Sequence, residues 1–348
     1  MKRKTTFKII TISIGFFFGL LLAEMAYRVF HFISYHDLKD IATGNRQPVV
    51  RSNEKLNLGQ IIQISANRRI VYELIPSSKY LFQNVLVQTN SLGYRDQKYQ
   101  PMKAKNKRRI VGLGDSVMFG WGVDEGACYL TQLENRLNQQ DSVVYEIINT
   151  GVPGYNTVME VATLEYKFAL DEIDMVVLNY IGNDWHLPNF LRKKPNYFSI
   201  EKSLMLERFN GNDGMDANLE SAPMNKFESH YANTIDRTPP EYYDMVGVEA
   251  YTAAMEHLGQ LRDKYGFMVL VLATNPEAIA DDFVYNACEK FGFELVDFYP
   301  IWKSYIAENP DAEYSLSLKD MHPSAASHGM IAGVLERPLL ELLYSDKQ

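Results

Sequence analysis

The sequence predicts a doubly wound α/β fold of the flavodoxin-like type, in which helices cover both faces of a mostly parallel, five-stranded sheet. Three observations carry this prediction. Short runs rich in Val, Ile and Leu recur along the chain, and each is bounded by Gly, Asn or Asp. Stretches with helical character separate these runs, and strands buried on both faces have this near-continuous apolar pattern. The composition, with 46% hydrophobic and 22% charged residues among 348, is that of a globular protein.

The α/β pattern begins near residue 109 and continues almost to the C-terminus. Because sites in such sheets form at the carboxyl ends of strands, the residues that follow each strand are the first candidates for function. Predicted strands occupy residues 109–114, 143–149, 174–180, 267–274 and 293–298. Predicted helices occupy residues 129–139, 157–170, 248–265, 281–291 and 324–343.

Residues 1–34 have the pattern of an export signal behind a short cytoplasmic tip. Three basic residues at positions 2–4 precede an uncharged stretch at 9–23, "IITISIGFFFGLLLA", and a helix that continues to residue 30 is long enough to span a membrane. Because small-residue cleavage sites are poorly formed, we favour an uncleaved transmembrane anchor over a cleaved signal peptide followed by secretion. The positive-inside rule then places the rest of the chain outside the cytoplasm, in the periplasm or the extracellular space.

Two further regions follow the anchor. Residues 35–107 are polar and contain strand-like pieces at 68–74 and 84–90, which predicts a small β-containing segment between the membrane and the main domain. Residues 108–348 form the α/β domain. Between residues 185 and 244 the α/β pattern is lost, and this stretch is too long for an ordinary connection, so we expect an insertion over the site.

The composition also disfavours some partners. A net charge of −8 gives no electrostatic support for binding nucleic acid. The two cysteines, Cys128 and Cys288, lie far apart; they are able to pair in an oxidising compartment, but two buried free thiols are the more common outcome. Neither has the spacing of metal ligands, and we expect no metal and no other cofactor.

The first predicted strand of the domain ends in "GDS", and Ser116 is the candidate nucleophile. A side chain at this strand end is exposed to the crevice of a doubly wound sheet. A serine hydroxyl becomes a nucleophile only when a base takes its proton and donors stabilise the charge that develops on the carbonyl oxygen. Gly-Asp-Ser alone is more often a turn, so the assignment depends on the strand ends that follow.

The next two predicted strand ends carry candidate donors. The second is followed by "NTGVPGYNT", where Gly151 and Gly154 allow the backbone to bend near a ligand and to present N–H groups. The third is followed by "YIGND", where Asn183 offers a side-chain amide and Asp184 a hydrogen-bond partner for the turn. Tight turns alone are a poor explanation for polar or glycine-rich corners at three successive strand ends.

A fourth candidate motif, "DMHP", lies near the C-terminus. His322 stands just before Pro323 and the last predicted helix, which predicts a loop position for it. As a general base, His322 would take the Ser116 proton, and Asp320 would orient the imidazole by accepting the Nδ1 proton. His328 falls inside the helix and is expected to cap or pack.

In this order, "GDS", "GVPG", "GND" and "DMHP" resemble the four blocks of the SGNH (GDSL-type) hydrolase superfamily, over roughly residues 108–343. The resemblance implies that Ser116 is the nucleophile and His322 the base. It also implies that the backbone N–H groups of Ser116 and Gly154 and the side-chain amide of Asn183 form the oxyanion hole.

The last block departs from the spacing usual in the superfamily. The Asp usually stands three positions before the His, where this chain has Lys319, whereas Asp320 stands two positions before His322. Extracytoplasmic members that modify polysaccharides show a variant spacing, and this chain also resembles them in its anchor and in its "TNSLGYRD" stretch. A Ser–His dyad assisted by a backbone carbonyl is the alternative to a triad that includes Asp320.

The resemblance implies a serine esterase that hydrolyses short acyl esters such as acetyl, on an acylated carbohydrate of the envelope or the extracellular space. Four residues beside the blocks are candidates for contact with substrate: Trp121, Tyr155, Asp184 and Trp185. Two alternatives stay open, an O-acyltransferase that uses the same acyl-enzyme and a non-catalytic glycan-binding or scaffold protein. A nucleotide-binding Rossmann protein is disfavoured, because the first turn lacks spaced glycines before the helix.

Overall fold

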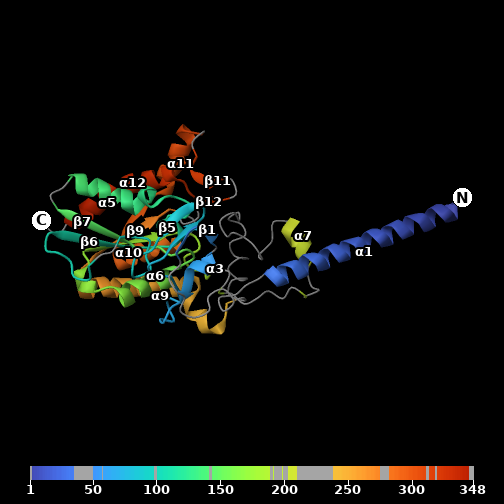
Figure 1. Cartoon of the computed structure of the whole chain (residues 1–348), viewed down its shortest axis with the longest axis horizontal. Helices are drawn as coiled ribbons and strands as arrows, with labels where there is room; N and C mark the ends of the chain where they lie inside the picture. Colours follow the sequence, from blue (N-terminus) through green and yellow to red (C-terminus); the bar gives the residue numbers. More distant parts are fainter. Residues whose placement is uncertain are drawn as a thin grey trace.

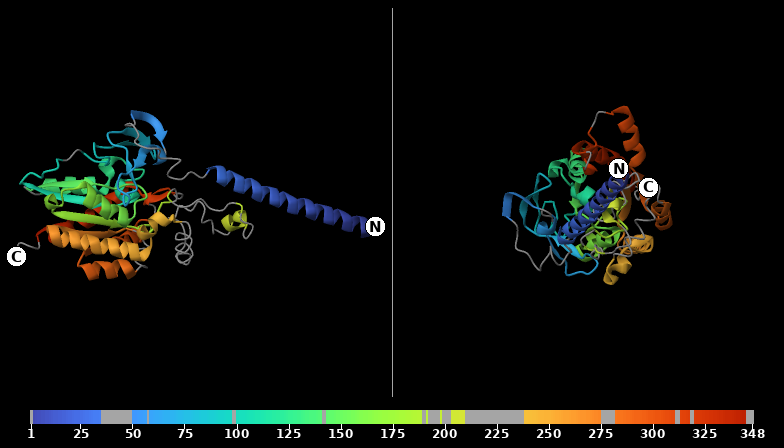
Figure 2. Two further views of the ribbon diagram at one scale, coloured as in Figure 1. Left: turned by 90° about the horizontal axis from the view of Figure 1, so that it is seen from below. Right: turned by 90° about the vertical axis from the view of Figure 1, so that its right-hand side faces the viewer.

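The computed structural model describes residues 2–34, 50–56, 58–97, 100–140, 143–188, 191, 198, 203–209, 238–274, 282–310, 313–317 and 320–344. One long helix, α1 (Lys2–Ser34), projects from an α/β body, as Figure 1 shows. The two ends of the chain lie at opposite ends of the molecule (Figure 2).

The body is built on a five-stranded sheet with strands β6 (Lys107–Leu113), β7 (Val144–Asn149), β8 (Met175–Tyr180), β9 (Met268–Ala273) and β10 (Glu294–Asp297). Their order across the sheet is β10-β9-β8-β6-β7, and every neighbouring pair is parallel. The chain therefore starts in β6, adds β7 on one side, and then adds the other three strands on the opposite side. This is the flavodoxin-like order, which confirms the predicted fold class.

Helices cover both faces of the sheet, which explains why its strands lack the alternation of a half-exposed sheet. All six residues of β8 are buried. The helices form two layers, above and below the sheet in Figure 1. One layer contains α5 (Tyr129–Gln140) and α12 (Ala325–Tyr344), and the other contains α6 (Thr157–Lys167), α9 (Gly247–Tyr265) and α10 (Asp282–Phe291).

A small β-containing segment precedes the sheet, as the sequence predicts. It consists of β1 (Val50–Leu56), α3 (Leu58–Ile61), β2 (Ile62–Ile64), β3 (Tyr72–Leu74), β4 (Lys79–Phe82) and β5 (Val85–Gln88). Strands β1, β4 and β5 form one sheet, and β2 and β3 form a hairpin. Buried residues of the segment, among them Tyr72, Phe82 and Val87, share one core with β6 and α6. The segment therefore packs as part of the body.

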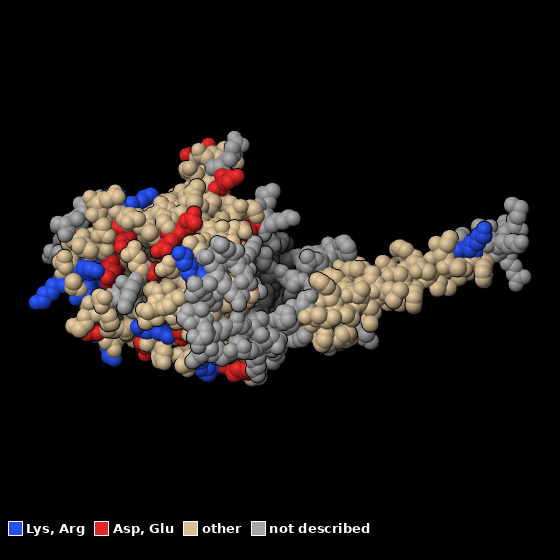
Figure 3. All heavy atoms as spheres, viewed as in Figure 1, with Lys and Arg blue, Asp and Glu red and all other residues tan. Residues whose placement is uncertain are grey.

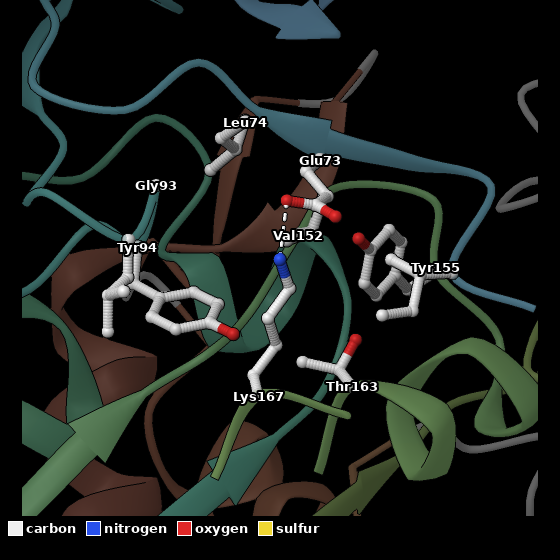
Figure 4. A pocket seen from close by; sticks show the side chains of 10 residues that line it. Glu73, Leu74, Gly93, Tyr94, Val152, Tyr155, Thr163 and Lys167 are labelled. Carbon is white, nitrogen blue, oxygen red and sulfur yellow. Dashed lines mark hydrogen bonds and ion pairs between the residues drawn. The ribbon is translucent and has the colours of Figure 1, made fainter. Parts of the chain in front are cut away.

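Figure 4 shows where this segment meets α6. Lys167 Nζ lies 2.8 Å from Glu73 Oε2, and this ion pair crosses a small pocket beside Tyr155 and Thr163. The pocket holds only about 10 Å³, which is room for a single water molecule. It is a seam between two packed parts of the body and is too small for an organic ligand.

Arg95 and Asp96, at the end of the "TNSLGYRD" stretch, attach the segment to the first half of the sheet. The buried Arg95 guanidinium donates to three backbone carbonyl oxygens, those of Phe119, Gly120 and Val123, at 2.6 to 3.1 Å. Asp96 Oδ2 accepts the backbone N–H of Asn149, at the end of β7, at 2.5 Å. The stretch therefore holds the loops that follow both β6 and β7.

Burial raises the pKa of the Asp96 carboxyl from the ordinary 3.8 to about 7. The folded chain thus favours protonated Asp96, and the stability that this provides is complete below about pH 4 and is lost as the pH rises through about 7. Between about pH 5 and about pH 8, we expect the free energy of unfolding of the wild type to fall by about 2 to 3 kcal/mol relative to that of Asp96→Asn. Urea denaturation of both proteins in mild detergent measures this difference. The exposed Asp171→Asn variant is the control, and an equal fall in wild type and Asp96→Asn would contradict the assignment.

Among the described residues, α1 is the one helix long and apolar enough to cross a membrane, over Ile10–Phe30, with a mean hydropathy of 1.8. The 21 residues of this apolar stretch span about 31 Å at 1.5 Å per residue, close to the thickness of a bilayer core. Figure 3 shows it as a projecting rod with Lys or Arg atoms near its N-terminal end. These properties fit both a signal anchor and a signal peptide.

The C-terminal half of α1 contacts a short helix, α7 (Leu204–Phe209). The carboxylate of Glu24 accepts three hydrogen bonds at 2.8 to 3.0 Å, from Ser203 Oγ, Leu204 N and Met205 N. Arg28 Nε donates to the same carboxylate at 2.6 Å. Glu24 therefore satisfies backbone N–H groups at the start of α7 that have no partner within the helix.

The structure also contains elements that the sequence does not predict. Helix α11 (Tyr299–Glu308) follows β10, and a hairpin of β11 (Ser315–Ser317) and β12 (Asp320–Pro323) precedes α12. His322, predicted in a loop, lies in β12; strands this short carry no clear sequence pattern. Most of the predicted insertion at 185–244 lies outside the described residues.

Both cysteines are buried and free. Cys128 directly precedes α5, and Cys288 lies within α10. Burial raises the pKa of the Cys128 thiol to about 11 and that of the Cys288 thiol to about 12. Both are therefore thiols rather than reactive thiolates at neutral pH.

Candidate active site

Ser116 lies where the strand order of the sheet reverses. Strand β6 has β7 on one side and β8 on the other, and the chain leaves β6 into a short helix, α4 (Ser116–Phe119). Asp115 caps this helix, because its Oδ1 accepts the backbone N–H of Val117 at 2.9 Å. Ligands of doubly wound sheets bind in the crevice at this reversal point, so the fold places Ser116 at the expected position for a site.

Two glycines let the surrounding backbone approach α4. Gly120 ends the helix in the left-handed conformation, with φ of 79°. Gly151, in the loop after β7, lies so close to α4 that an added Cβ would stand 2.4 Å from Phe119 N. No side chain fits there, and the loop is therefore pressed against the helix that presents Ser116.

His322 contacts Ser116 across 206 positions of sequence. The distance from His322 Nε2 to Ser116 Oγ is 2.9 Å, and that from His322 Nδ1 to Asp320 Oδ1 is 2.7 Å. Because Nδ1 faces a carboxylate, the neutral ring carries its proton on Nδ1 and leaves Nε2 to accept the hydroxyl proton. The backbone N–H of His322 donates to the same Asp320 oxygen at 3.2 Å. Asp320 thus reaches the imidazole from two positions before it.

Two carboxyl groups in different environments flank this pair. The hydrogen bond from His322 holds the pKa of Asp320 below its ordinary value, so this group is a carboxylate at neutral pH. Asp115 is fully buried, and burial raises its pKa. Its Oδ2 lies 3.0 Å from Ser116 Oγ. The single hydroxyl proton therefore has two acceptors within reach and is donated to one of them at a time.

The two other predicted oxyanion-hole residues follow β7 and β8. Asn183 Nδ2 donates to Asp115 Oδ2 at 3.4 Å, which connects it to the Ser116 loop, and Asn183 Oδ1 is buried without a hydrogen-bond partner among the described residues. Gly154 has φ of 82°, and an added Cβ would stand 3.0 Å from Tyr72 Oη. The described hydrogen bonds connect Asn183 to Ser116 through Asp115 and do not include Gly154.

Three of the residues predicted to contact substrate lie in the core instead. Tyr155 is 2% exposed, and its hydroxyl donates to the backbone carbonyl of Tyr72. Trp185 is also 2% exposed, and its Nε1 donates to a backbone carbonyl three positions earlier. Asp184 is fully buried and accepts the Thr157 hydroxyl at 3.1 Å. This burial contradicts the prediction, because side chains packed in this way have no surface to offer a sugar ring.

The fourth of these residues, Trp121, contacts the histidine and the aspartate. Its ring stacks on the His322 ring with centroids 4.7 Å apart and an angle of 12° between the planes. Its Nε1 donates to Asp320 Oδ2 at 3.2 Å. Trp121 is half-buried, and one face of its indole is occupied by the imidazole.

Two buried acids near the site, Asp115 and Glu160, are not predicted as site residues from the sequence. Asp115 lies within the "GDS" motif, directly before Ser116, and this position is the sequence feature that could have indicated a role in the site. Glu160, in the first turn of α6, is buried with both carboxyl oxygens unpaired among the described residues. Burial, together with the neighbouring Asp184 and Asp115, raises the pKa of Glu160 well above its ordinary value, and burial does the same for Asp184. Both carboxyl groups therefore take up a proton more readily than exposed acids do.

The Ser116 hydroxyl, the His322 imidazole and the Asp320 carboxylate thus form a hydrogen-bonded series at the reversal point of a doubly wound sheet. An arrangement with this geometry is able to activate a serine hydroxyl for attack on a carbonyl carbon. No group of three or more His, Cys, Asp or Glu side chains in the described part of the chain is arranged to hold a metal ion.

Solved structures similar to this chain include esterases and lipases at low identity. TesA is 14% identical, with 68% of this chain and 99% of TesA covered and a TM-score of 0.41. The acetyl xylan esterase AlAXEase is 14% identical, with 66% and 99% covered and a TM-score of 0.42. AlinE4, an SGNH-hydrolase family esterase, is 17% identical, with 69% and 98% covered and a TM-score of 0.36. No protein-family model and no curated protein sequence matches the chain.

Proposed function

We propose that this protein is a serine esterase that forms an acyl-enzyme on Ser116. The observation that carries the proposal is the series of contacts from Ser116 Oγ through the His322 ring to Asp320, at 2.9 and 2.7 Å. Both distances lie within the reach required for proton transfer between a nucleophile and its base and for orientation of that base.

In the proposed reaction, His322 Nε2 takes the Ser116 hydroxyl proton while Oγ forms a bond to the ester carbonyl carbon. Asp320 keeps the ring oriented and stabilises the imidazolium. The bond to the alcohol oxygen then breaks, and His322 returns the proton to that oxygen, which leaves the acyl group on Ser116. His322 next takes a proton from water, the water oxygen attacks the acyl carbon, and the Ser116 hydroxyl is restored as the carboxylic acid departs.

We assign stabilisation of the oxyanion to the backbone N–H groups of Ser116 and Gly154 and to the Asn183 amide. The Asn183 amide has two N–H groups, and one of them donates to Asp115, so the other is available for the substrate oxygen. A single donor of this kind contributes about 10²- to 10³-fold to the rate.

We further propose that the substrate is a short acyl ester, such as acetyl, on a carbohydrate outside the cytoplasm. The resemblance of the anchor and of the "TNSLGYRD" stretch to polysaccharide-modifying proteins supports this assignment. The apolar span Ile10–Phe30 of α1 supports a retained anchor, because its 21 residues exceed the roughly 7 to 15 usual in the apolar region of a signal peptide.

One gel experiment tests activity and anchoring together. The full chain is expressed in bacteria, and membrane and soluble fractions are treated with a fluorescent fluorophosphonate, which phosphonylates an activated serine as fluoride departs. We expect a labelled band of full-chain mass in the membrane fraction, and faster hydrolysis of p-nitrophenyl acetate than of longer acyl esters by that fraction. A labelled band that is smaller and soluble would show a cleaved signal. Protein detected by immunoblot without any label or hydrolysis would contradict the esterase proposal.

A further inference from the structure

Trp121 has three contacts that converge on the proposed catalytic residues. Its backbone N–H donates to the carbonyl oxygen of Ser116 at 3.1 Å. Its indole stacks on the ring of His322, and its Nε1 donates to Asp320 Oδ2. Trp121, which follows the left-handed turn at Gly120, thus contacts Ser116 through its backbone and both His322 and Asp320 through its side chain.

We propose that Trp121 is a positioning residue, which holds Asp320 and His322 in the alignment that lets His322 accept the Ser116 proton. This inference rests on the proposed function and deepens it, because it assigns a role in the reaction to a residue that touches neither the scissile bond nor the attacking oxygen.

The hydrogen bonds of Asp320 show why it needs such a residue. Its side chain is one-third exposed, and both donors from His322 bind the same oxygen, Oδ1. Held at one oxygen, a carboxylate is free to rotate about its terminal torsion, which is broad for aspartate. The donor from Trp121 binds the second oxygen, Oδ2, and fixes that torsion.

The stacking contact restrains the imidazole in the same way. An angle of 12° and a separation of 4.7 Å place the indole face against the His322 ring, which limits tilting of the ring away from Ser116 Oγ. Proton transfer depends on a short, aligned contact, and misplacement by about 1 Å costs about 100-fold in rate.

Trp121 is itself held from two sides. The ring of Phe82, at the end of β4, packs edge-on against it with centroids 4.9 Å apart. The next residue, Gly122, lies against the β11–β12 hairpin, because an added Cβ would stand 2.2 Å from Leu316 Cδ1. The small N-terminal β segment therefore supports the catalytic residues through Phe82 and Trp121.

The variant Trp121→Phe tests this inference, since phenylalanine keeps an aromatic ring over His322 and removes the donor to Asp320. We expect kcat for p-nitrophenyl acetate to fall roughly 10- to 100-fold, with KM changed by less than about twofold. The matched control is Trp302→Phe in α11, where a half-buried tryptophan packs against Tyr314 away from Ser116. That variant should keep wild-type kcat. A thermal unfolding midpoint within a few degrees of the wild type would show that Trp121→Phe is folded.

A double-mutant cycle separates positioning from a general structural effect. If Trp121 acts through Asp320, adding Trp121→Phe to Asp320→Asn should change kcat by less than about threefold, far less than it does in the wild type. Equal losses in both backgrounds, or unchanged kcat in the single variant, would overturn the inference. These outcomes are distinct from failure of the proposed function, in which the wild type itself lacks both hydrolysis and fluorophosphonate labelling.

Discussion

Replacing Ser116 with alanine should lower kcat/KM for p-nitrophenyl acetate by about 10⁴- to 10⁶-fold and should abolish covalent labelling by the fluorophosphonate. The substitution removes the only atom that forms the acyl bond, and the base, acid and donors have no function in acyl transfer without it. Activity is measured on the full chain in detergent, with labelling followed by gel fluorescence. Folding should be preserved, because the backbone contacts of α4 come from Asp115 and not from the Ser116 hydroxyl.

The matched control is Ser78→Ala, since Ser78 is also buried and its hydroxyl donates to a backbone carbonyl at 3.1 Å. That variant should keep wild-type activity and labelling. Activity of Ser116→Ala above about 1% of the wild type would eliminate the acyl-enzyme. Glycan binding that persists in a protein without any measurable ester cleavage would favour the non-catalytic alternative.

The second large effect is expected from Asp320→Asn, which should lower kcat by about 10³- to 10⁴-fold. The carboxylate accepts donors from His322 at Oδ1 and from Trp121 at Oδ2, whereas the amide has one oxygen, so the donors on one side lose their acceptor. The neutral amide also no longer stabilises the positive charge that develops on the His322 ring when it takes the Ser116 proton.

Steady-state kinetics of Asp320→Asn and Asp320→Ala, beside the control Asp297→Asn, measure this effect. Asp297, in β10, is half-buried and accepts the Tyr285 hydroxyl at 2.7 Å. The Asp297→Asn variant therefore measures how much activity is lost when a half-buried acid is replaced away from Ser116. We expect Asp320→Ala to show a loss of similar size, because it removes the same negative charge beside the His322 ring. If Asp320→Asn stays within about threefold of the wild type, a Ser–His dyad supported by a backbone carbonyl is the correct description.

Local patterns account for the parts of the fold that the sequence predicts. The apolar runs at β6, β7 and β8 are predicted as strands because short runs bounded by Gly, Asn or Asp are typical of a sheet covered on both faces, and this pattern is visible in each run by itself. The hairpin of β11 and β12 escapes prediction because three or four residues are too few to show a period.

The orientation of the aromatic residues beside the motifs is a feature that local patterns do not predict. Trp121, Tyr155 and Trp185 all follow predicted strand ends, and nothing in their neighbours distinguishes them. Two of them are buried in the core, and the third stacks on His322. Which direction each ring takes depends on the elements packed around it, such as β4 against Trp121.

The sequence by itself determined the fold class, the apolar N-terminal helix and the types of residue at the ends of the strands, because each of these depends on neighbours within a few positions. Only the tertiary structure decided that Asp320 reaches His322 from two positions away, that Trp121 bonds to its second oxygen, and that Arg95 holds the loop after α4. Contacts such as that between Ser116 and His322 join residues 206 positions apart. Their distances follow from strand order and from packing of the whole core, which no local pattern encodes.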